Sequence, residues 1–324
     1  MPAARRPLSA MAIAVLIAAH FCPAAPAAAS DAAGTAPEVV ASIAPLHSLA
    51  AKVMDGVGQP RLLVAGGLSP HTYALKPSDA KALANARAVF WIGPELERFL
   101  EKPLAALAGD GRVVRLGKAD GVRMLPARKA GAWAEADHDH GHKHGDDDHD
   151  EVDAHLWLDP GNAARMVEAM VGALSRIDPD NGARYRANGE RTLAALRGLE
   201  TEIRAALKPV AAVPYLVFHD AFQYFERRFG LTALGAVSVG SERSPGARRL
   251  AELRQRIRDR RAICVFTQPQ YEPALATTVV EGTGARIGVL DDLGAGLAPG
   301  PGLYDELLRA LARSLVDCLR PARG

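Results

Sequence analysis

The chain has 324 residues, of which 48% are hydrophobic and 23% are charged, and its formal net charge is +2. This length is sufficient for two domain-sized cores, and the composition is too apolar and too varied for a disordered or fibrous protein. Because no basic stripe is interleaved with aromatic residues, nucleic acid is excluded as an expected partner.

The first 29 residues predict a signal peptide. Arg5 and Arg6 precede the apolar run 11–19, and the small residues 27–29 form the pattern expected before a cleavage site. No segment offers the roughly 20 apolar residues that a membrane-spanning helix needs. We therefore expect a soluble protein that is exported after loss of residues 1–29.

From residue 38 onward, short β-rich runs alternate with amphipathic helical segments. The predicted strands cover 39–43, 61–65, 88–92 and 112–116, and the predicted helices cover 45–56, 78–86 and 95–108. Strands separated by helices of this length imply parallel βαβ units. We expect an N-terminal α/β lobe over residues 36–180.

Residues 181–207 have no strand signal and no proline, which predicts one long helix. Apolar side chains recur every three or four residues, at Leu196, Leu199, Ile203 and Leu207. At a rise of 1.5 Å per residue the helix would be about 40 Å long. The alternative is a pair of helices broken at Gly189 or Gly198, since each interior glycine costs about 1 kcal/mol relative to alanine. We expect residues 181–208 to link two lobes.

The alternation then starts again and predicts a second α/β lobe over residues 209–324. Its strands are expected at 215–218, 231–239, 262–266 and 286–290, and its helices at 220–229, 246–259, 273–282 and 304–319. The fold class is therefore α/β, with two similar lobes that contain parallel sheets and are joined by a long backbone helix. A cleft is expected between the lobes.

Three histidines stand at the ends of predicted strands or in the loops that follow. They are His71, His155 and His219, and they are separated by 84 and 64 residues. In open α/β sheets ligands bind beyond the carboxyl ends of the strands, so these side chains are expected to converge on the cleft. Local zinc-finger spacing is excluded by the separations, which means that the fold must assemble the site.

Three imidazoles predict a metal site that prefers zinc to manganese, because manganese favours oxygen ligands. The fourth ligand is expected to be Asp291, which follows the last predicted strand, or a water molecule. His47, near the start of the first predicted helix, is expected to be structural.

A separate histidine-rich loop spans residues 131–153. It contains nine acidic residues and one lysine, and its histidines are His138, His140, His142, His144 and His149. Such a composition cannot bury a core, and clustered imidazole and carboxylate groups bind zinc, copper or nickel. We expect an accessory metal-binding loop with weaker affinity than the folded site.

Cys264 and Cys318 are the cysteines that remain after loss of the leader. An even pair in an exported protein predicts one disulfide, which would stabilise the fold by about 2–4 kcal/mol. Two buried free thiols are the alternative.

Several motifs, in order along nearly the whole mature chain, resemble those of the periplasmic zinc-binding receptors of ABC importers. They are residues 69–79 (SPHTYALKPSD), 89–95 (VFWIGPE), 155–160 (HLWLDP), 218–226 (FHDAFQYFE) and 269–270 (PQ). The resemblance implies a solute-binding protein with two α/β lobes and a long helix. It also implies that the protein captures Zn²⁺ and delivers it to a membrane permease that works with a cytoplasmic ATPase.

By motif position, His71, His155 and His219 match the three histidine ligands of that family, and the two cysteines match its disulfide. The chain departs from the family at Pro70 and Gln268, where some members have acidic residues, so the fourth ligand stays open.

Two other functions share part of this pattern. A receptor for manganese or iron would be expected to replace a histidine ligand by a carboxylate. A zinc hydrolase could also use three histidines and a water, but the chain has no Gly-x-Ser-x-Gly, His-Glu-x-x-His or phosphate-loop motif. We therefore expect a monomeric periplasmic receptor and not an enzyme.

Overall fold

The computed structural model describes residues 1, 36–65, 67–107, 111–128, 152–237, 246–271 and 273–320. The chain separates into two units, 1–35 and 36–324, and the fold described below is that of the second. Residues 2–29 of the predicted signal peptide and residues 131–151 of the predicted histidine-rich loop lie outside the described residues. Within the described ranges, no helix is both long enough and apolar enough to cross a membrane.

The first sheet is parallel, with the strand order β2-β1-β3-β4. Its strands are β1 (Val39–Ile43), β2 (Arg61–Val64), β3 (Ala88–Trp91) and β4 (Val113–Arg115). Ala41 of β1 pairs with Leu62 on one side and with Phe90 on the other. The connecting helices α1 (Ala44–Val53) and α2 (Pro77–Asn85) follow the predicted pattern and contain a proline in their first turn.

The helix predicted over 95–108 is wrong in extent. The structure instead has a 3₁₀ turn, η1 (Arg98–Leu100), followed by the short helix α3 (Glu101–Ala105). The buried Glu97 carboxylate accepts hydrogen bonds from the backbone N–H groups of Ile92 and Gly93, at 3.1 and 3.0 Å. These bonds tie the segment to the end of β3, and Pro103 would interrupt any helix already begun before it. The helix therefore begins two residues before the proline.

The second sheet is also parallel and has the order β10-β9-β7-β8. Its strands are β7 (Tyr215–Val217), β8 (Ala233–Ala236), β9 (Cys264–Thr267) and β10 (Arg286–Val289). Its helices are α6 (Gln223–Phe229), α7 (Ala247–Asp259), α8 (Pro273–Val280) and α9 (Leu303–Leu319). Both sheets share the order second-first-third-fourth along their own stretch of chain, which confirms the prediction of two similar lobes. The end of the strand predicted over 231–239 lies outside the described residues.

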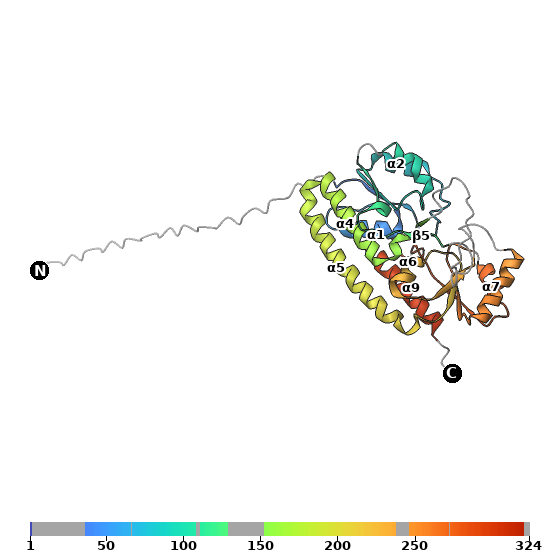
Figure 1. Cartoon of the computed structure of the whole chain (residues 1–324). Helices are drawn as coiled ribbons and strands as arrows, with labels where there is room; N and C mark the ends of the chain where they lie inside the picture. The colour runs from blue at the N-terminus through green and yellow to red at the C-terminus, as the bar shows by residue number, and fades with distance from the viewer. Residues whose placement is uncertain are drawn as a thin grey trace. The chain divides into compact units, whose positions relative to one another are not determined.

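One long helix, α5 (Gly182–Leu207), runs without a break and confirms the predicted connector. It lies beside α4 (Pro160–Ile177), a helix that was not predicted, as Figure 1 shows. The α4 helix has a recognisable start, because the Asp159 side chain accepts the N–H of Gly161 at 2.7 Å. Gly189 does not break α5. A Cβ there would lie 2.6 Å from Val171 Cγ2, so the glycine permits close packing on α4.

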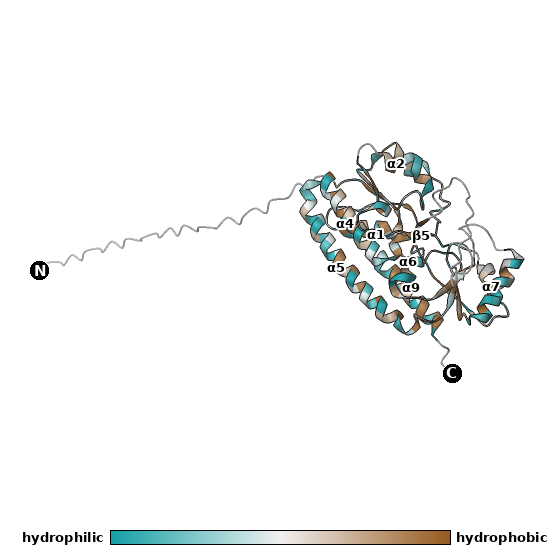
Figure 2. Cartoon of the chain, viewed as in Figure 1, coloured by the Kyte–Doolittle hydropathy of each residue, from teal (hydrophilic) through white to brown (hydrophobic). Residues whose placement is uncertain are grey.

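The helices that cover the sheets carry apolar and polar faces, which Figure 2 shows as brown and teal stripes. Phe90 of the first sheet and Phe266 of the second belong to one continuous buried cluster. The last helix, α9, packs on α1 and on α5. Between α1 and α9, Ser48 accepts the N–H of Tyr304 at 3.0 Å. Apolar packing therefore extends through the two sheets and the helices between them.

Cys264 in β9 and Cys318 in α9 form a disulfide, with their Cα atoms 6.2 Å apart. The predicted pair is thus bonded, and the alternative of two free thiols is wrong. The bond fixes the end of α9 to the central part of the second sheet.

Candidate metal site

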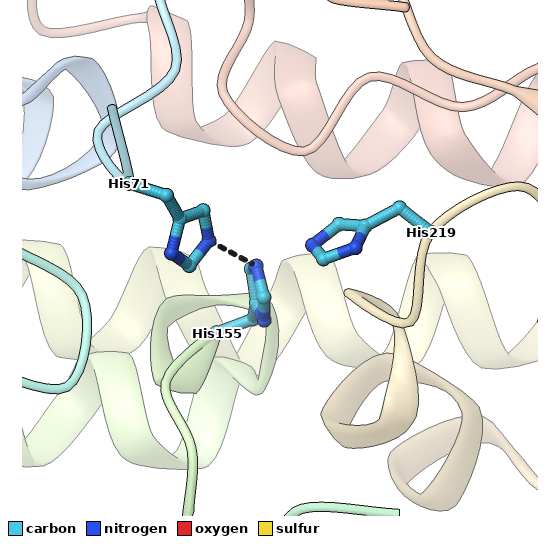
Figure 3. Close-up of side chains that lie close together, drawn as sticks. All are labelled: His71, His155 and His219. Atoms are coloured by element: carbon cyan, nitrogen blue, oxygen red, sulfur yellow. Dashed lines mark hydrogen bonds between the residues drawn. The ribbon is translucent and has the colours of Figure 1, made fainter. Parts of the chain in front are cut away.

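Three loops bring the predicted histidines together (Figure 3). His71 lies in a turn beyond β2, and His219 lies just beyond β7, so each follows a parallel strand at its carboxyl end. His155 follows β6 (Val152–Asp153), which pairs with β5 (Leu125–Pro126) in a two-stranded ribbon. The first sheet, the ribbon and the second sheet each contribute one imidazole.

The geometry of the three rings suits one metal ion. One ring nitrogen from each histidine lies within 4.8 Å of the other two. Nε2 of His71 and Nε2 of His155 are 3.5 Å apart. Two nitrogens that bind the same tetrahedral Zn²⁺ at 2.0–2.1 Å are separated by about 3.4 Å. Closing the widest pair by up to about 1.4 Å would therefore place all three nitrogens around one ion.

Burial keeps two of these rings neutral. Burial, together with the nearby His155, lowers the pKa of His71 to about 3. The pKa of His219 is also far below its ordinary value, because of burial and then because of the other two histidines. A neutral imidazole is the form that binds a metal. His71 and His219 therefore have free lone pairs across the physiological pH range.

His155 differs because a carboxylate supports it. Its Nδ1 lies 2.8 Å from Asp153 Oδ1, and the same oxygen accepts the backbone N–H of His155 at 3.0 Å. Burial alone would lower the pKa of His155, but the hydrogen bond and charge of Asp153, with the charges of Asp292 and Asp220, raise it. The contact leaves Nε2 directed at the other two rings. Asp153 has the position of a group that orients a metal ligand, a role that was not predicted from the sequence.

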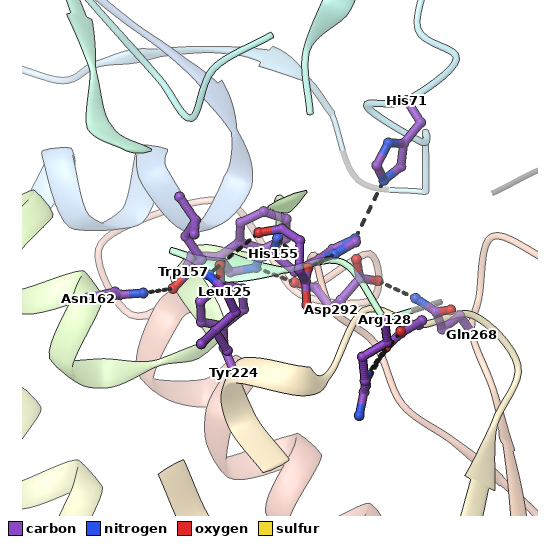
Figure 4. Close-up of polar contacts among 12 residues, drawn as sticks. His71, Leu125, Arg128, His155, Trp157, Asn162, Tyr224, Gln268 and Asp292 are labelled. Atoms are coloured by element: carbon purple, nitrogen blue, oxygen red, sulfur yellow. Dashed lines mark hydrogen bonds and ion pairs between the residues drawn. The ribbon is translucent and has the colours of Figure 1, made fainter. Parts of the chain in front are cut away.

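Hydrogen bonds hold this region between the two sheets (Figure 4). Trp157 Nε1 donates to the backbone oxygen of Asp292 at 2.7 Å. The hydroxyl of Tyr224 in α6 donates to the backbone oxygen of Asp153 and accepts the N–H of Leu125, both at 2.8 Å. Residues beside the histidines are thus fixed by contacts between distant parts of the chain.

Arg128 forms a further connection, from the segment after β5 to the second lobe. It bonds to both carboxylate oxygens of Asp220, the residue after His219, and to Glu226 in α6 at 2.6 Å. The side chains of Arg128 and Glu226 are 16% and 4% exposed. Burial raises the pKa of Glu226 to about 7, against the opposing charge of Arg128. This ion-pair network was not predicted, because its partners are 92 and 98 residues apart.

Asp291, the expected fourth ligand, is not in the three-histidine group. Its Oδ1 accepts the backbone N–H groups of Leu293 and Gly294, at 3.0 and 2.8 Å. The next residue, Asp292, instead lines a small cavity together with His71 and His219. A direct role for Asp291 stays a prediction.

The other predicted histidines have different outcomes. His47 is buried and its Nε2 lies 3.0 Å from the backbone oxygen of Pro60, in agreement with a structural role. The accessory-loop histidines lie outside the described residues: His138, His140, His142, His144 and His149.

The fold and the three-imidazole group together define a class, the two-lobed solute-binding receptors for metal ions. The family model of the periplasmic zinc-uptake complex component A, ZnuA, matches residues 39–318. The chain therefore belongs to the ZnuA family of periplasmic zinc-uptake components.

Individual relatives agree with this assignment. The chain is 45% identical over 313 residues to the high-affinity zinc uptake system protein ZnuA of Brucella abortus (strain 2308), covering 90% of this chain and 94% of that protein. The ZnuA of Yersinia pestis is 38% identical over 290 residues, with 87% and 91% covered. A solved ZnuA deletion mutant with zinc bound has a TM-score of 0.73 at 25% identity, covering 88% of this chain and 99% of that one.

Proposed function

We propose that this chain is a periplasmic receptor that captures Zn²⁺ and delivers it to an ABC-type importer, which consists of a membrane permease and a cytoplasmic ATPase. Membership of the ZnuA family supports this function. The observation that carries it is the group of three ring nitrogens, from three distant loops, within 4.8 Å of one another. Such a group can bind a cation, as a metal receptor requires.

His71, His155 and His219 are the proposed ligands. Their donor set is neutral and consists of nitrogen, which favours zinc over manganese or iron(II). Competition between Zn²⁺ and Mn²⁺ at the same site, in one buffer, tests this preference. Tighter binding of Mn²⁺ would support the alternative receptor function.

Alanine substitution of each ligand tests the site. The mature protein is titrated with zinc against a chelator strong enough to empty weak sites. His71→Ala, His155→Ala and His219→Ala should each lose the tight site, because two nitrogens leave the ion underligated. His47→Gln is the matched control, since His47 is a buried histidine that bonds to Pro60. Retention of the tight site in any of the three alanine variants would exclude that residue as a ligand.

The histidine-rich loop is proposed to collect zinc near the receptor site. Its nine acidic residues attract cations, and its composition cannot bury a core, so that ordering it around an ion would cost about 1–2 kcal/mol per residue. Deletion of residues 137–150 should remove weak zinc sites and retain the tight site. Loss of the tight site would mean that the loop supplies primary ligands.

Export by cleavage after residue 29 belongs to the same proposal, and the mass of the periplasmic protein tests it.

A zinc hydrolase is the alternative class of protein, and it would show turnover with ester, amide or phosphate substrates. The expectation of a monomer stays a prediction for light scattering to test.

A further inference from the structure

A small cavity adjoins the histidine group. It has a volume of about 10 Å³, and His71, His219, Gln268, Gln270, Tyr271 and Asp292 are among the residues that line it. This volume accommodates about one water molecule. Beside two of the proposed ligands, the cavity therefore has room for a single small group between the ring nitrogens and the polar side chains opposite them.

Asp292 is the carboxylate of this cavity, and it is held from both sides. It is 5% exposed, and its Oδ1 accepts a hydrogen bond of 2.8 Å from Gln268 Nε2. Its backbone oxygen accepts the indole N–H of Trp157. Figure 4 shows Asp292 between Gln268 and the segment of His155 and Trp157. A buried carboxylate with so few donors is costly to maintain unless a cation compensates its charge.

Gln268 is itself 2% exposed, and its Oε1 has no hydrogen-bond partner among the residues that the structure describes. The amide nitrogen is used for Asp292, so the carbonyl oxygen is left to accept from a group within the cavity. A water molecule that donates one hydrogen to Gln268 and one to Asp292 would satisfy both side chains. Its lone pairs would then be free for a cation.

The charge of the ion also requires an acid nearby. Three neutral imidazoles do not themselves offset the charge of Zn²⁺ in a buried site, and the nearby Asp153 carboxylate is already bonded to His155 on the side away from the other two rings. Asp291 is engaged by the backbone of its own loop. Asp292 lies outside the group of ring nitrogens that are within 4.8 Å of one another, which favours contact through an intervening water over direct ligation.

We infer that Asp292, positioned by Gln268, is the carboxylate that completes the metal site, and that it acts on the ion through one water molecule held in this cavity. The inference rests on the proposed zinc-binding function. It assigns Asp292 as a positioning and charge-compensating residue, in preference to Asp291.

Isosteric substitutions on the mature protein separate the two aspartates. Asp292→Asn keeps an acceptor for Gln268 but removes the charge, and should weaken tight zinc binding by about 10–100-fold. Asp291→Asn also keeps an acceptor for its backbone partners and should have the smaller effect. Asp180→Asn, at an exposed aspartate between α4 and α5, is the control for loss of a carboxylate. Gln268→Met should weaken binding in the same direction as Asp292→Asn.

Two further measurements distinguish this role from a structural one. The zinc-free Asp292→Asn protein should unfold at the same temperature as the unmodified protein or at a higher one, because a buried charge is removed. With Co²⁺ in place of zinc, the visible absorption spectrum should change in Asp292→Asn and not in Asp180→Asn, because the water bound to the metal loses the carboxylate, one of its two acceptors.

The inference is overturned if Asp292→Asn weakens zinc binding by less than about tenfold, or if Asp291→Asn has the larger effect. Parallel losses of thermal stability and affinity in Asp292→Asn would also overturn it, since they would indicate a structural residue. Failure of the unmodified protein to bind zinc tightly would instead contradict the proposed function, so the two failures are distinguishable.

Discussion

Asp153 Oδ1 accepts both the backbone N–H and the Nδ1–H of His155, two residues further along the chain. This double contact fixes the ring and its tautomer, and it leaves Nε2 as the only nitrogen of His155 that can bind a metal. One carboxylate oxygen therefore sets both the direction and the basicity of the central ligand.

Removal of the charge on Asp153 should weaken zinc binding without unfolding the protein. Asp153→Asn retains an oxygen that can accept from His155, but it no longer stabilises a ring that carries a partial positive charge. We expect a loss of affinity of about 10–100-fold, measured by competition with a chelator at pH 7. Glu168→Gln, in an exposed ion pair of α4, is a matched control. An unchanged zinc affinity in Asp153→Asn would show that the contact is only structural.

The pH dependence of zinc binding should reflect one proton and not three. The pKa of His155 is raised above 6.5, whereas the pKa of His71 is about 3 and that of His219 is far below 6.5. As the pH falls through the pKa of His155, zinc must displace a proton from Nε2, and affinity should fall about tenfold per pH unit. Calorimetry in buffers of different ionisation enthalpy would count this proton. Release of three protons near pH 5 would contradict these protonation states.

The sequence predicted the periodic features of this structure well. Strand–helix alternation identified both lobes, and the positions of His71, His155 and His219 at strand ends or in loops identified the residues that meet, although the short strand β6 before His155 was not predicted. The α4 helix was missed although Asp159 and Pro160 mark its start and its apolar residues recur at helical spacing. Asp292 and Gln268 could not be assigned from periodicity, because a hydrogen bond between residues 24 positions apart depends on how β9 and β10 align. Asp292, which follows the expected Asp291, lines the cavity. Neither composition nor periodicity distinguishes two neighbouring aspartates in a loop.

Two glycines of α5 should respond in opposite directions to the same substitution. A Cβ at Gly189 would collide with Val171, whereas a Cβ at Gly198 meets nothing within 4 Å. Gly198→Ala should stabilise the protein by up to about 1 kcal/mol through helix propensity. Gly189→Ala should destabilise it by about 1–3 kcal/mol, because α4 and α5 must separate. Urea unfolding measures both, and equal shifts of the two midpoints would refute the packing argument.

Arg128 should contribute to stability through the two carboxylates that it pairs. Arg128→Met leaves Glu226 buried without its partner, and we expect a loss of about 3 kcal/mol at pH 7. Arg165→Met removes an exposed ion pair with Glu168 and should change stability by about 0.5 kcal/mol or less. Similar losses in the two variants, measured by chemical unfolding, would mean that burial of the Arg128 network has no energetic effect.

The disulfide should affect stability more than zinc affinity. Replacement of Cys264 and Cys318 by serine opens a loop closed across 54 residues and should reduce the free energy of unfolding by about 2–4 kcal/mol. Neither cysteine belongs to the three-histidine group, so the folded variant should retain the tight site. Loss of that site at a temperature where circular dichroism shows a folded protein would indicate that the bond also positions ligands.

The packing of α9 on α1 and α5 has a consequence for biogenesis. Lys52 in α1 pairs with Asp305 in α9 at 2.8 Å, across 253 positions of sequence. Under the proposed export, the N-terminal part of the chain is translocated first. The apolar surfaces of α1 and α5 then stay uncovered until residues 303–319, which form α9, have also been translocated. Contacts this distant in sequence form slowly, and the incomplete chain exposes surface that promotes aggregation. A chain truncated before α9 should therefore yield an aggregation-prone fragment and not an independent first lobe, so that secretion must finish before either half of the receptor is properly folded.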